Sequence, residues 1–245
     1  MVHDFNTGGP SAAAWCSAAP VKSAPTVDPI YYPPEQYTRL LAGLVHKLNN
    51  VITVLSGHTG LLLLQPKLSR SVKDPIEQMA QATMLLSRYL DEAVIVARSP
   101  KLNLGPVDLV AVLRSVCERS ATPMALFQPP GGLEVYGDAP HLQAALDQLM
   151  RNAAEAEATK VVCTVTDAGD RYNISLRDNG TGINPESLQR IFEPFFTTRK
   201  NQDNMGIGLF RVQGYLAVTG GTLAVKSDGK SYSDFCLSLP KVRPA

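Results

Sequence analysis

The sequence lacks the features that mark several specialised classes of protein. Its four cysteines are scattered over 245 residues without a CxxC pair, which indicates neither a disulfide framework nor a zinc knuckle and favours a reducing compartment. A net charge of +1 lacks the basic excess of a dedicated nucleic-acid binder. The longest apolar stretch, 51–64, is interrupted by polar residues and is shorter than the roughly 18 residues of a membrane span, and no secretory signal is recognisable. We therefore expect a cytoplasmic protein without a membrane span or a nucleic-acid partner.

The apolar content is high enough for folded domains. Hydrophobic residues make up 44% of the chain and charged residues 18%, which argues against a chain that is disordered throughout. With a typical domain size of about 150 residues, the length of the chain favours two domains. Residues 1–34 are rich in Ala, Ser, Pro and Gly without helical or strand periodicity, so they are predicted to be a flexible leader. Residues 35–100 and 106–245 are the two candidate domains.

Residues 35–100 are predicted to form a helical hairpin. A break near Pro66 separates two helical patterns, and Asp74-Pro75 with Glu77 has the spacing of a capping box at the start of the second helix. A lone hairpin leaves its apolar stripe half covered, so we expect a homodimer in which a second copy completes a four-helix bundle. The stripe, with spacings mainly of three and four, consists of Leu41, Leu44, Leu48, Ile52, Leu55 and Leu62, then Ile76, Met79, Leu86, Leu90, Val94 and Ala97.

The pattern changes after Pro106 to that of an α+β domain. Helices are predicted at 108–119 and 138–158, each starting with an Asp cap, and a short strand at 133–136. Two further pairs of strands, 161–166 with 172–177 and 222–226 with 234–239, flank Asp/Gly turn signals. We expect an α/β sandwich in which helices cover one face of a mixed sheet.

Three short segments of this domain are suited to binding a nucleotide. They are Gln148–Ala156 on the long helix, Asp178–Ile183 after a strand, and Gly206–Leu209 at the start of a helix. Their glycines allow close backbone approach, a helix N-terminus attracts phosphate, and the amide oxygen of Asn152 suits magnesium. Each feature alone is usually an ordinary turn or a surface residue. Their combination predicts an ATP site.

The order and spacing of these segments resemble the Bergerat-type ATP-binding fold of sensor histidine kinases, gyrase-type topoisomerases and chaperone ATPases. The resemblance spans about 106–240, and the segment IFEPFFTTRK at 191–200 is characteristic of histidine kinases. It implies that Asp178 bonds the adenine amino group, that Asn152 holds Mg²⁺, and that 198–204 forms a mobile lid. Asn204 departs from the family, which has a glycine there. The other implied nucleotide-binding residues are Gly180, Gly182, Ile183, Thr198, Arg199, Lys200, Gly206, Gly208 and Leu209.

The phosphoryl acceptor is expected to lie on the hairpin. In the hydrolytic relatives a glutamate at position 148 activates water, whereas Gln148 cannot act as a base. At about 100° per residue His46 lies roughly 170° from the mean direction of the apolar stripe and faces solvent, where its imidazole can attack a phosphate. Helix geometry alone still favours a plain surface histidine. His58 is predicted to pack inside the hairpin.

The surroundings of His46 resemble the phosphorylated box of histidine kinases, with Ala42-Gly43 before and Asn49-Asn50 after. The resemblance implies that His46 is phosphorylated and that Asn50 orients water during dephosphorylation of a response regulator. Lys47 departs from the family, which has Asp or Glu there.

The resemblance as a whole implies a two-component histidine kinase. Such an enzyme phosphorylates itself with ATP and Mg²⁺ and passes the phosphoryl group to an aspartate on a response regulator receiver domain. The alternative is a histidine phosphotransfer or phosphatase adaptor, or a pseudokinase that binds receivers. Lys47 and Asn204 favour that alternative, and the intact nucleotide-binding set disfavours it. A gyrase-like or chaperone-like ATPase is disfavoured by Gln148 and the hairpin.

Overall fold

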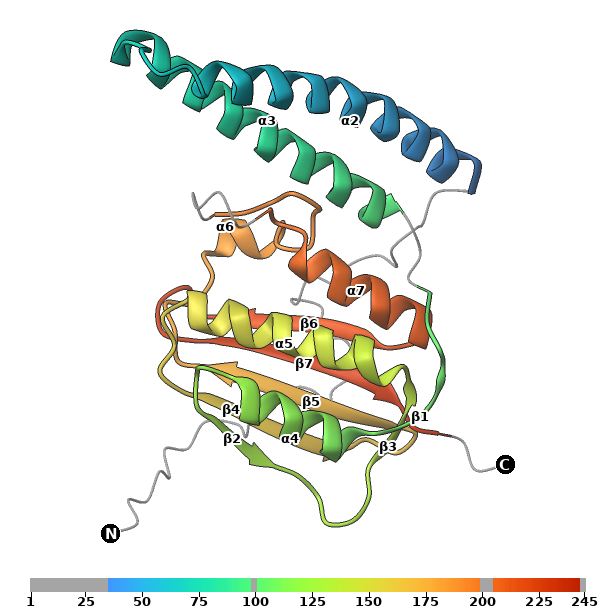
Figure 1. The fold of residues 1–245 in the computed structure, drawn as a ribbon. Helices are drawn as coiled ribbons and strands as arrows, with labels where there is room; N and C mark the ends of the chain where they lie inside the picture. Colours follow the sequence, from blue (N-terminus) through green and yellow to red (C-terminus); the bar gives the residue numbers. More distant parts are fainter. Residues whose placement is uncertain (1–34, 98–100, 199–204, 243–245) are drawn as a thin grey trace.

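The computed structural model describes residues 35–97, 101–198 and 205–242 of the chain (Figure 1). It consists of a two-helix hairpin followed by an α/β domain, as the sequence predicts. The predicted leader, 1–34, lies outside the described residues. None of the helices in the described ranges combines the length and the hydropathy that crossing a membrane requires.

The hairpin is formed by α2 (Glu35–Leu63) and α3 (Arg70–Ala97), which run antiparallel (Figure 1). The predicted Asp74 cap is wrong, because α3 begins four residues earlier. The carbonyl oxygen of Ser69 accepts hydrogen bonds from the backbone N–H groups of Val72 and Lys73, at 3.0 and 2.9 Å. Glu77 does not close a capping box but pairs with Lys73 at 3.4 Å. Pro75 therefore lies inside the helix.

The apolar stripe divides into a closed seam and an open flank. The seam between the helices buries Val45, Ile52 and Thr59 from α2 with Ile76 and Thr83 from α3. Other large apolar side chains of the predicted stripe stay exposed in the single chain, where Leu44 and Met79 are 54% and 55% exposed. Leu41, Leu90 and Val94 are half-buried. We call the following set the apolar flank: Leu44, Leu48, Leu55, Leu62, Met79 and Leu86.

His58 does not pack inside the hairpin as predicted. Its side chain is exposed, and the neighbouring Thr59 occupies the buried position at that turn. The Thr59 hydroxyl donates to the carbonyl oxygen of Leu55 at 2.9 Å, which satisfies its polar group inside the seam. A small residue that bonds its own helix fits this seam.

The α/β domain is built on a five-stranded sheet in the order β2-β4-β5-β7-β6. β2 and β4 are parallel, and the other neighbouring strands are antiparallel. A separate antiparallel pair joins β1 (Gly105–Asp108) to β3 (Glu134–Gly137). The sheet strands are β2 (Met124–Phe127), β4 (Val161–Asp167), β5 (Arg171–Asp178), β6 (Thr222–Ser227) and β7 (Ser233–Pro240).

Three helices cover one face of this sheet, as predicted: α4 (Leu109–Arg119), α5 (Ala139–Glu155) and α7 (Gly208–Thr219) (Figure 1). A short helix, α6 (Pro185–Leu188), follows β5. Asp108 and Asp138 cap α4 and α5, accepting from the backbone N–H groups of Ala111 and His141 at 3.0 Å each. The core lies between helices and sheet and includes the fully buried Leu113, Leu142, Leu146, Ile174, Leu216 and Leu237.

Candidate nucleotide-binding site

A cavity of about 1160 Å³ lies between the hairpin and the α/β domain. The structure brings to this one cavity segments that are distant in the sequence. Gly180 packs beneath its wall, while Arg199, Lys200 and Asn204 lie outside the described residues. The predicted site residues that line it are Asn152, Asp178, Gly182, Ile183, Thr198, Gly206, Gly208 and Leu209.

Asp178 ends strand β5 and is buried. Its Oδ1 accepts hydrogen bonds from the backbone N–H groups of Gly180 and Ser233, at 2.9 and 3.3 Å. Burial raises the pKa of Asp178 above its ordinary value and the nearby Asp234 adds to this, while the two backbone donors act in the opposite direction. The carboxyl group is thus fixed in orientation at the cavity wall.

Two glycines allow the loop before α7 to pack closely against its neighbours. Gly206 has φ +68°, and a Cβ on it would collide with the carbonyl oxygen of Phe196 and lie 2.6 Å from the carbonyl carbon of Phe195. A Cβ on Gly208 would collide with the side chain of Gln148. At Gly206 only glycine therefore fits without moving the neighbouring backbone, whereas at Gly208 a Cβ would require the Gln148 side chain to move.

The N-terminus of α7 borders the cavity and lacks a side-chain cap. The first intrahelical bond runs from the N–H of Arg211 to the carbonyl of Ile207, at 3.0 Å. The backbone N–H groups of Gly208, Leu209 and Phe210 therefore have no acceptor within the helix. Donors without an acceptor in their own helix, at the positive end of a helix dipole and in a glycine loop, form a favourable site for phosphate oxygens.

Asn152 belongs to a chain of polar side chains on α5. Gln148 Nε2 donates to Asn152 Oδ1 at 3.0 Å, and Arg151 donates to Gln148 Oε1 at 2.6 Å. All three side chains line the cavity. A neutral amide, that of Gln148, therefore contacts Asn152 Oδ1 from the preceding turn of α5.

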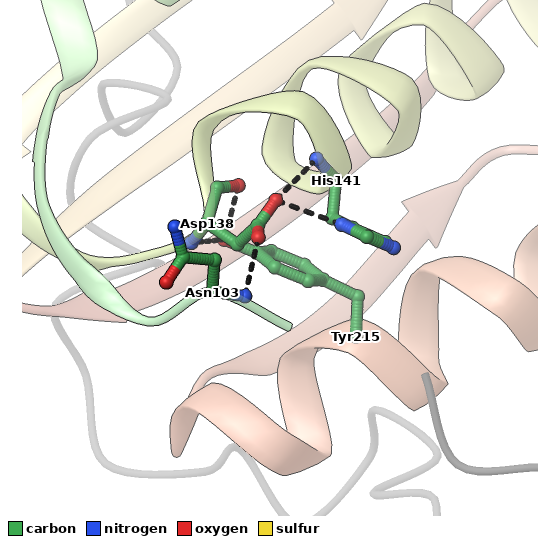
Figure 2. A network of polar contacts seen from close by, with 4 residues as sticks. All are labelled: Asn103, Asp138, His141 and Tyr215. Carbon is green, nitrogen blue, oxygen red and sulfur yellow. Dashed lines mark hydrogen bonds and ion pairs between the residues drawn. The ribbon is translucent and has the colours of Figure 1, made fainter. Parts of the chain in front are cut away.

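A polar network at the edge of the cavity was not predicted from the sequence (Figure 2). Asp138 Oδ1 accepts from the backbone N–H of His141 at 3.0 Å and pairs with its Nδ1 at 2.7 Å, and Asp138 Oδ2 accepts from the Asn103 N–H at 2.7 Å. The Tyr215 hydroxyl accepts from the Asp138 N–H at 3.3 Å, and its ring stacks with that of His141. The network joins the segment after the hairpin to α5 and α7. The Asp138-His141 spacing of a helix cap was the available signal.

The hairpin also contributes to the cavity. Arg88 and Glu92 of α3 line it, and the Tyr89 ring meets the Phe195 ring edge-on at a centroid distance of 6.5 Å. His46 and Asn50 are exposed on α2, as predicted, and neither lines the cavity. The structure thus gathers most of the predicted nucleotide-binding residues at one cavity and leaves the candidate phosphoacceptor on the hairpin surface.

Comparison with known proteins gives a family match for most of the α/β domain. Residues 137–243 match the family model described as histidine kinase-, DNA gyrase B-, and HSP90-like ATPase. The sensor histidine kinase CpxA of Escherichia coli K12 is 26% identical over 185 residues, covering 71% of this chain and 40% of the relative. The sensor histidine kinase ZraS of Klebsiella oxytoca is 28% identical over 211 residues, covering 82% and 45%. The chain thus spans less than half the length of these relatives.

Solved structures agree with these sequence matches. Full-length ShkA, in a complex with AMPPNP, has a TM-score of 0.58 and 25% identity, covering 85% of this chain and 47% of that chain. The Acinetobacter baumannii histidine kinase AdeS has a TM-score of 0.52 and 20% identity, covering 81% and 98%, and shows the same fold. The α/β domain therefore matches the model of the histidine kinase-, DNA gyrase B- and HSP90-like ATPase family, and the hairpin with the α/β domain has the fold seen in these histidine kinase structures.

Proposed function

We propose that this chain is an ATP-dependent protein histidine kinase of a two-component system. It phosphorylates His46 and transfers the phosphoryl group to an aspartate of a response regulator receiver domain. One observation carries the proposal: an ATPase-family cavity suited to a nucleotide is joined to a hairpin that exposes a histidine. In the proposed division, 1–34 is a leader, 35–100 the dimerisation and phosphotransfer domain, and 106–245 the catalytic domain.

The cavity residues fit ATP in chemical type. Asp178 offers a buried acceptor to the adenine amino group, with Gly180, Gly182 and Ile183 shaping the adjoining wall. Gly206, Gly208 and Leu209 present backbone N–H groups to the phosphates. Thr198, Arg199 and Lys200 belong to the lid segment expected near the phosphates.

Asn152 is the candidate ligand for Mg²⁺, since an amide oxygen suits a hard cation that also binds phosphate. Its Oδ1 accepts from Gln148 in this structure, so binding the metal exchanges that hydrogen bond for a coordination bond. Gln148 has no carboxylate with which to activate water, which favours transfer to a side chain over hydrolysis.

The apolar flank supports homodimerisation. Its six leucine and methionine side chains form an unpaired face along both helices of the hairpin. A second hairpin packed on this face gives the four-helix bundle expected from the sequence. At about 100° per residue His46 and Asn50 lie on the other side of α2 from Leu44, Leu48 and Leu55. They therefore remain accessible to nucleotide and receiver in the dimer.

Labelling with γ-³²P-ATP and Mg²⁺ tests the proposal. We expect an acid-labile, alkali-stable label on the wild-type chain and none on His46→Gln. His58→Gln is the matched control, because His58 is also an exposed histidine of α2, and it should label like wild type. Nucleotide binding without any label would instead favour a receiver-binding adaptor, and a label that persists in His46→Gln would refute the assigned acceptor.

A further inference from the structure

A histidine that attacks phosphorus needs help at its second ring nitrogen. As one nitrogen forms the bond to phosphorus, positive charge develops on the imidazole, and a carboxylate that accepts the proton on the other nitrogen stabilises and orients the ring. Helix α2 supplies no such group. Its only acidic residue is Glu35, about three turns before His46, and the residue after the histidine is the cation Lys47.

The neighbouring helix brings a carboxylate to the required place. Asn49 Nδ2 donates to Asp91 Oδ1 across the hairpin groove at 3.3 Å. Asn49 follows His46 by three positions, which puts their Cβ atoms about 5–6 Å apart on the helix surface. The Asp91 carboxylate is therefore bound to a side chain that lies one helical turn from His46 on α2.

The two side chains also lie on the same side of the hairpin. Measured at about 100° per residue from the buried Val45, Asn49 and His46 are displaced in the same direction, by roughly 40° and 100°. The Asn49–Asp91 bond fixes Asp91 on that side of α3. The leucines of the apolar flank are displaced in the opposite direction, so a partner hairpin packed there leaves this pair uncovered.

Glu92 is the other described carboxylate at this level of α3, but it faces elsewhere. It lines the nucleotide cavity, on the side of α3 that faces the ATPase domain. Asp91 does not line that cavity and is exposed. Of the two, only Asp91 is joined to the side of α2 that carries His46.

We propose that Asp91 is the positioning residue for His46, in place of a carboxylate next to the histidine in the sequence. This inference rests on the proposed phosphorylation of His46. Asn49 holds Oδ1 of Asp91, and Oδ2 faces the imidazole once the exposed His46 ring rotates toward it, a rotamer change that requires no helix movement.

The transfer step then balances as follows. The lone pair of one ring nitrogen attacks the γ-phosphorus, an N–P bond forms, the bond from phosphorus to the bridging oxygen breaks, and ADP leaves with that electron pair. Asp91 accepts the hydrogen bond, and then the proton, from the second ring nitrogen. The product is a neutral phosphoimidazole beside a protonated Asp91, which returns its proton to solvent.

Two phosphoryl donors test the role of Asp91 on the full-length chain. We measure the initial rate of His46 labelling with ATP and Mg²⁺, and separately with phosphoramidate, a small donor that does not use the nucleotide cavity. Asp91→Asn is expected to lose about 100-fold in rate with both donors, and Asp91→Glu to recover most of it. The KM for ATP should stay unchanged, because Asp91 lies outside the cavity.

Asp74→Asn is the matched control, an exposed aspartate on the same helix about 25 Å away. It should label at the wild-type rate with both donors. An Asp91→Asn variant that labels normally from phosphoramidate overturns the proposal, and so does an equal loss in Asp91→Asn and Asp91→Glu. If ATP gives no label but phosphoramidate labels His46 in a way that depends on Asp91, the proposed kinase activity is refuted and the role of Asp91 is supported. Absence of labelling from both donors refutes both.

Discussion

Two aspartates begin helices in the α/β domain, and they should differ strongly in their contribution to stability. Asp108 is exposed and its side chain accepts one hydrogen bond, from the N–H of Ala111. Asp138 is buried and accepts three, from the backbone and ring of His141 and from the backbone of Asn103 (Figure 2). Replacing each by alanine compares a simple cap with a cap that also joins two other segments.

The expected magnitudes follow from the numbers of bonds. Asp108→Ala removes a helix cap and should lower the free energy of unfolding by about 1 kcal/mol. Asp138→Ala loses a similar cap and two more bonds to a charged acceptor, for a total of about 3 kcal/mol. Urea unfolding followed by far-UV circular dichroism measures both. Equal losses of unfolding free energy in the two variants would refute the conclusion that the network in Figure 2 joins separate segments of the domain.

The pH dependence gives the same comparison an independent test. Burial raises the pKa of Asp138, but its hydrogen bonds from His141 and Asn103 outweigh this, so the folded-state pKa lies below the ordinary value of 3.8. The stabilisation from Asp138 is therefore fully present above the unfolded pKa of about 3.9 and is lost as pH falls through the folded pKa. The gap between wild type and Asp138→Ala should narrow below about pH 4. A gap that is constant with pH would contradict the charge-assisted network.

Three further outcomes test the site and the core. Because the pKa of Asp178 is raised, its carboxylate takes up a proton at a pH above 3.8. The affinity for a fluorescent ATP analogue should therefore fall as pH drops through that pKa. The Asp178→Asn variant should bind the analogue weakly, with an affinity that does not change over this pH range. Gly206→Ala should lose about 1 kcal/mol or more of nucleotide binding energy, whereas Gly169→Ala, at φ +82° with open space around it, should lose only stability; equal nucleotide affinity in both would refute the packing argument. Burial raises the pKa of Cys163 to about 12, so a thiol reagent at pH 8 should label this residue only after unfolding, and labelling of the native chain would contradict its burial.

Elements with local signals were predictable from the sequence. The Asp caps of α4 and α5 and the turns between paired strands depend on residues a few positions apart, and the structure confirms them. Strand β2 was not predicted from the sequence. This strand has only four residues, and it is defined by its parallel pairing with β4, which is distant in the sequence. The start of α3 was misplaced because Asp74-Pro75 is a strong local signal, yet the helix begins from the Ser69 carbonyl.

In the candidate site, too, residues in local sequence motifs were predictable, and residues that are positioned by distant contacts were not. Asn152, Asp178 and Gly206 stand in short motifs, and the structure brings them to one cavity. Arg88 and Glu92 have no motif, and only the packing of the hairpin on the α/β domain makes them part of the cavity wall. Contacts between two domains produce no periodic pattern in the sequence of either domain. The residues that α3 contributes to the cavity could therefore not be predicted from local sequence patterns.

A contact between the hairpin and the α/β domain involves a strained residue beside the glycine loop that begins α7. Phe195 has φ +67°, which costs a non-glycine residue about 1–2 kcal/mol, and its ring meets Tyr89 of α3. Its backbone packs directly on Gly206, where no Cβ would fit. His46 is outside the cavity, so the proposed phosphoryl transfer would require the two domains to move relative to each other. Because Phe195 touches both α3 and the loop that begins α7, such a movement and the proposed binding of phosphate would act on the same short segment.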